Sequence, residues 1–202
     1  TTRLAGLETG DYDVITKVQT ADYDRLKSSK NVEPIIKGPA NNIYLMFNQQ
    51  KGLTSKLNIR RAIQAAINAE EIMGAAVPNS RFRVIDPSLY PPESAYYNFA
   101  GGDLYNQNDV EKAQEYLKKA HYNGEPITFQ SIATNPLQVR VGVALVSQLK
   151  KAGMNAELKS LDLQTWVANR RNGDALMMYH SGGNWIDPSL YQPEFNGTFC
   201  RS

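Results

Sequence analysis

The second half of the chain alternates between helical and strand patterns, and this alternation constrains the fold more than any other feature. Helical stretches show apolar residues at three- and four-residue spacing, and the strand stretches are short, apolar or alternating. The alternation predicts a helix first and then strands and helices in turn, at 108–119, 127–132, 137–152, 154–161, 162–171 and 175–179. Helices that alternate with strands along a chain are typical of an α/β domain.

The first half gives a less regular pattern. We expect short helices and strands there at 3–8, 12–15, 21–30, 32–36 and 43–47. The glycine, proline and asparagines of 38–42 separate the last two strands.

Two longer segments follow. Residues 57–75 keep an apolar face at helical spacing and predict one continuous helix. Residues 78–105 contain several prolines and glycines and predict a long irregular loop. So long a loop inside a compact domain is usually functional or wraps a neighbour. The glycine-rich tail, 181–202, also reads as a loop.

Composition excludes several classes of protein. The 202 residues are 42% hydrophobic and 21% charged, with a net charge of +2, which is ordinary for a globular protein. The chain has no run of lysines and arginines long enough to indicate nucleic-acid binding. It also has no apolar stretch that approaches the ~18 residues that a membrane span needs. The single cysteine, Cys200, excludes an intrachain disulfide. The chain begins Thr1-Thr2-Arg3 without a signal peptide, and we expect it to be a fragment.

Candidate catalytic and metal-ligating residues are few. The two histidines, His121 and His180, have no carboxylate at helical spacing, so we expect no metal site. His121 falls at the predicted C-terminal end of a helix, where its imidazole would interact favourably with the helix dipole. The sequence carries no nucleophile elbow, zinc-protease motif or phosphate-binding loop. We therefore expect no cofactor and no enzymatic activity.

The segment 179–188 is the candidate binding site. It follows the last predicted strand, and in open α/β domains ligands bind outside the carboxyl ends of strands. His180, Asn184, Trp185 and Asp187 combine an imidazole, an amide, an indole and a carboxylate in this segment. Such a set suits an amphipathic solute. The alternative interpretation is an ordinary loop with a half-buried tryptophan.

Four blocks in order along the chain resemble the family 5 extracellular solute-binding proteins, whose members bind dipeptides, oligopeptides or nickel. Residues 3–13 resemble the family's turn before an aspartate, and 59–72 resemble its most specific helical signature, which follows a Phe-Asn pair at 47–48. Residues 113–122 are similar to "Ala-x-x-Leu-Leu-x-x-Ala-Gly-Tyr". The fourth block runs over 145–158 and ends at Trp185 to Pro188.

The resemblance implies a lobe of a periplasmic-binding-protein-like (type II) fold, with a mixed sheet flanked by helices, incomplete in this chain. Residues 1–42 would be part of the first lobe and the hinge strand, and 43–202 most of the second lobe. It further implies a monomeric, periplasmic receptor that binds a peptide or peptide-like solute between two lobes. Its partners would be that solute and the permease subunits of an ABC importer.

Two site residues come from the resemblance. In dipeptide-binding relatives an arginine after an Asn-Pro step binds the ligand carboxylate, and Arg140 matches it. Its guanidinium suits a carboxylate through a bidentate fork. An aspartate three residues before the Asp-Pro step pairs with the ligand amine, and Asn184 stands there instead. An amide would hold an ammonium group less well.

Two other functions remain open at this point. An α/β enzyme could use Asp187 or His180 as acid or base, and it would show a strongly perturbed pKa in a closed pocket. A protein-binding scaffold of the same fold would instead expose a contiguous apolar patch. The loop 78–105 is the segment in which we would expect such a patch.

Overall fold

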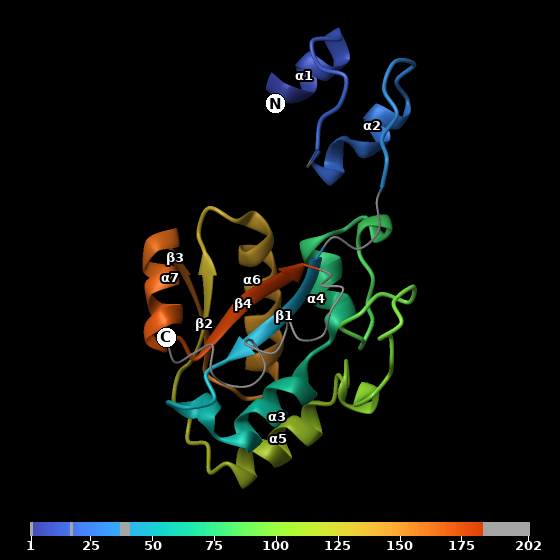
Figure 1. The fold of residues 1–202 in the computed structure, drawn as a ribbon. Helices are drawn as coiled ribbons and strands as arrows, with labels where there is room; N and C mark the ends of the chain where they lie inside the picture. The colour runs from blue at the N-terminus through green and yellow to red at the C-terminus, as the bar shows by residue number, and fades with distance from the viewer. Residues whose placement is uncertain (1, 17, 37–40, 184–202) are drawn as a thin grey trace. The chain divides into compact units, whose positions relative to one another are not determined.

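The computed structural model describes residues 2–16, 18–36 and 41–183 and divides the chain into two compact units, Thr1–Gly38 and Pro39–Ser202 (Figure 1). The division falls four residues before the boundary predicted from the sequence. Whether each unit belongs to a different lobe of a receptor stays a prediction.

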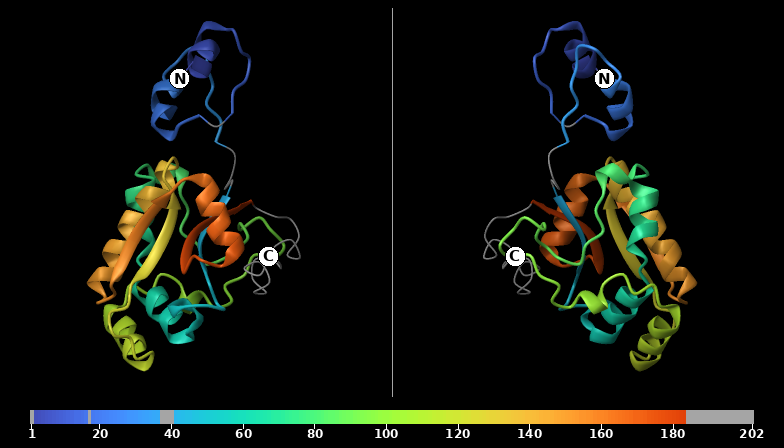
Figure 2. Two further views of the ribbon diagram at one scale, coloured as in Figure 1. Left: turned by 90° about the vertical axis from the view of Figure 1, so that its left-hand side faces the viewer. Right: turned by 90° about the vertical axis from the view of Figure 1, so that its right-hand side faces the viewer.

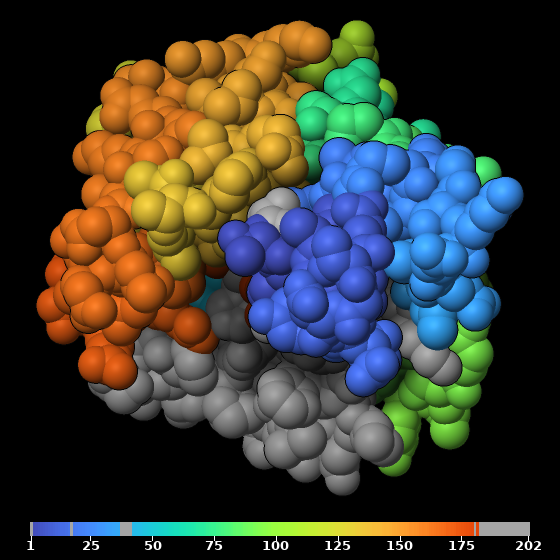
Figure 3. Space-filling view, turned by 90° about the horizontal axis from the view of Figure 1, so that it is seen from above, coloured from blue at the N-terminus to red at the C-terminus, as the bar shows by residue number. Residues whose placement is uncertain are grey.

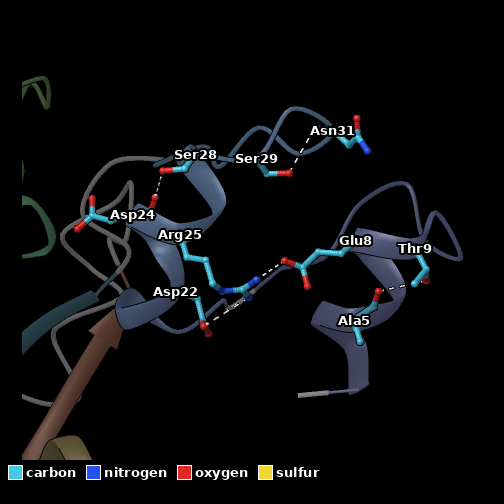
Figure 4. A network of polar contacts seen from close by, with 9 residues as sticks. All are labelled: Ala5, Glu8, Thr9, Asp22, Asp24, Arg25, Ser28, Ser29 and Asn31. Carbon is cyan, nitrogen blue, oxygen red and sulfur yellow. Dashed lines mark hydrogen bonds and ion pairs between the residues drawn. The ribbon is translucent and has the colours of Figure 1, made fainter.

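The first unit contains two short helices, α1 (Thr2–Thr9) and α2 (Tyr23–Lys27), with a 3-10 turn, η1 (Thr20–Asp22), before the second. Arg25 joins them, because its guanidinium binds the carboxylates of Glu8 and Asp22 (Figure 4). The strands predicted at 12–15 and 32–36 are absent, and this expectation was wrong for the structure of this chain. No other described strand pairs with either segment.

The second unit is built on a four-stranded sheet in the order β1-β4-β2-β3. Its strands are β1 (Asn41–Phe47), β2 (Ile127–Ile132), β3 (Ala156–Leu161) and β4 (Met177–Gly183). β2 runs parallel to β3 and β4, and β1 runs antiparallel to β4. The sheet is therefore mixed, as predicted. β4 continues to Gly183, so the prediction of a loop from 181 onward was wrong at its start, and 184–202 lie outside the described residues.

Helices cover both faces of this sheet. They are α3 (Leu57–Ala66), α4 (Ala69–Ala76), α5 (Val110–Lys119), α6 (Pro136–Lys151) and α7 (Leu163–Asn172). Figures 1 and 2 show α6 on one face of the sheet and α7 on the other. The main core lies on the α6 face and includes the fully buried Phe129 and Leu145, while Trp166 of α7 packs with Met178 on the opposite face.

The helix predicted at 57–75 is interrupted. α3 ends at Ala66, Ile67 takes an extended conformation, and Asn68 starts α4 by accepting a hydrogen bond from the backbone N–H of Glu71 at 3.0 Å. The side chain of Gln148 on α6 binds the break: its Oε1 accepts from the N–H of Asn68 at 2.9 Å, and its Nε2 donates to the carbonyl of Asn68 at 3.1 Å. A buried glutamine thus replaces the helical hydrogen bonds that the break removes.

The loop between α4 and α5 is irregular, as predicted, apart from the 3-10 turns η3 (Ser80–Phe82) and η4 (Gly102–Leu104). It passes beside the edge strand β1 (Figure 2), and there Asn42 Nδ2 donates to the carbonyl of Leu89. Asp86 orders the loop by accepting from the hydroxyl of Tyr97 at 2.9 Å and from the N–H of Ser88 at 2.7 Å. Desolvation and the Asp86 carboxylate raise the pKa of the Tyr97 hydroxyl.

Candidate functional site

The carboxyl edge of the sheet is the part of the second unit where a ligand site is expected. Because β2, β3 and β4 are parallel, their ends at Ile132, Leu161 and Gly183 lie along the same edge. The start of β1 joins them, since Asn41 pairs with Gly183. Ligands of open α/β sheets bind at such an edge.

Two helices begin at this edge and present their N-termini there. The Asn135 carboxamide caps α6 by accepting from the N–H groups of Leu137 and Gln138 at 3.1 and 3.3 Å. The Asp162 carboxylate caps α7 by accepting from the N–H of Thr165 at 3.0 Å. Hydrogen bonds from the side chain and backbone of Thr165 lower the pKa of the Asp162 carboxyl below its ordinary value of 3.8.

Polar side chains hold these helix starts against the strand ends. Gln138, in the first turn of α6, accepts a hydrogen bond from the N–H of Ile132 at 2.8 Å. Ser131 and Ser160 join the ends of β2 and β3 through their hydroxyls at 3.2 Å. Gln138 and Ser131 are both buried. These buried hydrogen bonds fix the helix starts to the strand ends along this edge.

Arg140 lies in the second turn of α6 and faces the end of α4. Its Nε donates to the carbonyl of Ala76 at 2.9 Å, and the residue as a whole is exposed. Among the described residues, no hydrogen bond or ion pair involves its two terminal nitrogens. The backbone contact fixes the direction of the guanidinium and leaves the part that would hold a carboxylate accessible.

Arg83 is a second cation at the same helix end, and the sequence pattern did not single it out. Its Nη1 donates to the carbonyls of Val77 and Pro78 at 2.7 and 2.8 Å. These carbonyls follow directly on that of Ala76, which Arg140 binds. Seen from above in Figure 3, α6 in yellow to gold lies between α7 in orange and α4 in teal-green. Because Arg83 stands in an irregular loop, no periodicity could have placed it here.

The remaining predicted site residues are placed only in part. His180 lies in β4, where its backbone pairs with Tyr44 of β1. Asn184, Trp185 and Asp187 lie outside the described residues. Arg140 and His180 thus belong to elements that reach the same edge, and no contact between them is described. His121 lies at the end of α5, as expected, with a positive φ of 51°.

A small hollow lies at the opposite edge of the sheet, and it is too small for a solute. Its volume is about 10 Å³, and its lining includes Asn48 at the end of β1 and Gly173 before β4. A hollow of this size holds about one water molecule. In the described part of the chain, no group of histidine, cysteine and acidic side chains could hold a metal ion. None of the described helices is long and apolar enough to cross a bilayer.

Comparison with known proteins agrees with the family resemblance found in the sequence. Residues 1–199 match the family described as "Bacterial extracellular solute-binding proteins, family 5 Middle". The chain is 24% identical to the nickel-binding periplasmic protein of Escherichia coli, over 95% of this chain and 39% of that protein. It is 25% identical to the dipeptide-binding protein of the same organism, over 96% of this chain and 37% of that protein.

Solved structures show the same fold. The ABC transporter substrate-binding protein CtaP of Listeria monocytogenes superimposes with a TM-score of 0.80 at 18% identity, covering 100% of this chain and 42% of CtaP. The chain therefore spans about two fifths of the length of the proteins that it matches. The match over nearly the whole chain shows that this protein belongs to the family 5 bacterial extracellular solute-binding proteins, which are binding proteins and not enzymes.

Proposed function

We propose that this chain supplies most of one lobe, and a piece of the other, of a periplasmic receptor for an ABC importer. The receptor binds a peptide or peptide-like solute between its lobes and delivers it to the permease. The family and the fold support this proposal, and so does one feature of the second unit described next.

The observation that carries the proposal is the pairing of Asn41 with Gly183. The described second unit begins with β1 and ends with β4, and these two strands are neighbours in the sheet. The start of β1 and the end of β4 therefore lie together at one corner of the carboxyl edge (Figure 1). In the proposed receptor these two adjacent strands lie at the hinge, and rotation of the unit about that corner closes it over the ligand.

The carboxyl edge supports binding of a solute that carries a carboxylate. The N-terminus of α6, capped by the neutral carboxamide of Asn135, brings positive partial charge to this edge, and Arg140 adds a full charge with two terminal nitrogens available. One relative is named as a nickel-binding protein and another as a dipeptide-binding protein, so membership of the family does not by itself identify the solute. The arginine favours a peptide-like acid over a bare cation.

The amine end of the solute is the less strongly bound end in this proposal. Asn184 stands where the resemblance places an aspartate, and an amide brings no charge to an ammonium group. We therefore propose that the solute is bound mainly through its carboxylate and its apolar parts. Trp185, His180 and Asp187 would contribute the remaining apolar and polar contacts.

Native mass spectrometry of the natural-length receptor, purified from its host, tests this function. We expect a co-purified solute that carries a carboxylate. Replacing Arg140 with alanine removes a charge-assisted contact of about 1.5–3 kcal/mol, so the affinity for that solute should fall about 10- to 100-fold. Arg171→Ala, at an exposed site near the end of α7, is the matched control and should leave affinity unchanged.

Two results would contradict the proposal. One is a receptor that binds no small molecule, either as purified or from a panel of di- and tripeptides. The other is an Arg140→Ala variant with unchanged affinity, and a loss of affinity supports the proposal only where the melting temperature is unchanged. The melting temperature matters because Arg140 also binds the carbonyl of Ala76, so a folding defect must be separated from a binding defect.

A docking surface for a protein partner is the second candidate function. The loop between α4 and α5 exposes large apolar side chains, with Val84 70% and Phe99 62% exposed. Exposed apolar groups of this size are typical of interaction surfaces when they gather in one patch. If this loop contacts the permease, the double variant Val84→Ser, Phe99→Ser should lower receptor-stimulated ATP hydrolysis while solute affinity stays unchanged. Equal stimulation by the variant and the natural protein would exclude this candidate.

A further inference from the structure

The guanidiniums of Arg83 and Arg140 lie near each other at the C-terminal end of α4. Arg140 donates to the carbonyl of Ala76, and Arg83 donates to the carbonyls of the next two residues, Val77 and Pro78. Consecutive Cα atoms lie about 3.8 Å apart, so these neighbouring carbonyls hold the two guanidiniums within about 10 Å of each other. The backbone at the end of α4 therefore fixes the positions of two cations.

Each guanidinium keeps one complete pair of nitrogens available after these contacts. A carboxylate is bound most strongly by two parallel N–H groups on neighbouring nitrogens of a guanidinium. Arg140 uses only its Nε, so the pair Nη1 and Nη2 remains. Arg83 uses Nη1 for both of its carbonyls, so the pair Nε and Nη2 remains, without a hydrogen bond or ion pair to any described residue. The end of α4 thus presents two bidentate sites for acidic groups.

The packed elements around these two arginines bring little negative charge to them. α6 contains no aspartate or glutamate, and the two glutamates of α4, Glu70 and Glu71, lie in its first turn at the opposite end. Asp86 of the loop accepts hydrogen bonds from Tyr97 and Ser88 instead. The C-terminus of α4 contributes about half a negative charge. Two positive charges are therefore only partly compensated among the described residues, and an anion between them would relieve their repulsion.

We propose that Arg83 determines specificity by binding a second acidic group of the solute whose carboxylate Arg140 binds. This assignment rests on the proposed function, because it takes Arg140 as the carboxylate site. It names the solute class as a peptide-like acid that ends in aspartate or glutamate. The main-chain and side-chain carboxylates of such a residue are a few bonds apart, so each can reach one of the two guanidiniums. A neutral terminal residue leaves the available nitrogens of Arg83 without an acidic partner and binds less tightly.

Two variants of Arg83 separate this role from its contribution to the end of α4. Arg83→Gln keeps an N–H donor for a backbone carbonyl and removes the charge, whereas Arg83→Lys keeps the charge. A merely structural role changes the melting temperature and the affinity for all solutes alike. A role in specificity changes the ratio of affinities for an acidic solute and its neutral analogue.

Calorimetric titration of the natural-length receptor with alanyl-glutamate and alanyl-glutamine tests the inference, because the two dipeptides share a shape and differ in charge. We expect alanyl-glutamate to bind about tenfold more tightly. In Arg83→Gln the ratio should fall to about 1 with the affinity for alanyl-glutamine unchanged, and Arg83→Lys should retain most of the preference. Arg81→Gln removes an equal charge from an exposed position in the same loop, and this matched control should keep the tenfold ratio.

The outcomes distinguish this inference from the proposed function. Equal affinities for the two dipeptides in the natural receptor would overturn the inference and leave the proposed function standing. A tenfold preference that survives Arg83→Gln would overturn it as well, because another group would then bind the second acid. A receptor that binds neither dipeptide, nor any other di- or tripeptide, would contradict the proposed function and this inference with it.

Discussion

At the scale of single residues, the C-terminal ends of α5 and α6 are held by the same pattern of backbone hydrogen bonds. α5 ends in a Schellman arrangement, in which Tyr122 N–H donates to the carbonyl of Leu117 and His121 N–H to that of Lys118, both at 3.1 Å. The same arrangement ends α6, with Gly153 at φ 88° in the place that His121 occupies at φ 51°. Histidine is strained in this conformation and glycine is not.

His121→Gly should therefore stabilise the protein by about 0.5–1 kcal/mol, because the left-handed conformation then carries no side-chain strain. Gly153→His is the mirrored control and should destabilise by a similar amount. Chemical denaturation of both variants measures the two changes in the free energy of unfolding. Loss of stability in His121→Gly would show that the imidazole makes a favourable contribution that outweighs the backbone strain.

Residue identities predicted some of these features and not others. Asn108, Asp109 and Gly153 were readable as helix boundaries because their side chains, or the lack of one, act locally. The orientation of Arg140 was not readable, because the carbonyl that it binds belongs to a residue 64 positions earlier in the chain. The resemblance named Arg140, and only the fold could show that it also holds the end of α4.

At the scale of elements, the apolar pattern predicted the helices and strands of the second unit but wrongly joined α3 and α4 into one continuous helix. The spacing of apolar residues continues from α3 into α4 because both helices bury one face in the same core. Periodicity alone therefore could not reveal the break at Ile67. The local signal was present: Asn68, followed three residues later by Glu71, is a common helix start.

α6 packs closely against the sheet because Gly142 has no side chain. A Cβ at this position would lie 2.7 Å from Cδ1 of Leu158 and 2.8 Å from Cε1 of the fully buried Phe129. Both distances are well below van der Waals contact. The cost of overpacking a core of this kind is about 1–3 kcal/mol, which exceeds the gain of about 1 kcal/mol in helix propensity.

Gly142→Ala should therefore destabilise the protein, whereas Gly74→Ala should stabilise it by about 0.5–1 kcal/mol. Gly74 is the matched control because it also lies inside a helix, α4, and the nearest atom to its added Cβ is 4.0 Å away. Thermal unfolding of the two variants gives the comparison directly. A stabilising Gly142→Ala would mean that Phe129 and Leu158 can move aside at little cost.

At the scale of the whole molecule, the sequence predicted an α/β fold but could not predict how its strands are ordered. The strands that begin and end the described second unit, β1 and β4, are far apart in sequence and adjacent in space. No local pattern encodes that pairing, because the two strands are distant in the sequence and meet only in the folded sheet. The segments 12–15 and 32–36 show the opposite case: their pattern is that of strands, and no strand among the described residues pairs with them.

The central claim is that a solute binds at the carboxyl edge of the second unit and that closure buries it there. Hydrogen exchange of the natural-length receptor, with and without its co-purified solute, tests this claim most directly. The account predicts slower exchange on binding in peptides that cover 131–138, 160–166 and 178–183, and no change around Asn48 and Gly173 at the opposite edge. Protection confined to that opposite edge, or unchanged exchange at all three carboxyl-edge peptides despite binding, would contradict it.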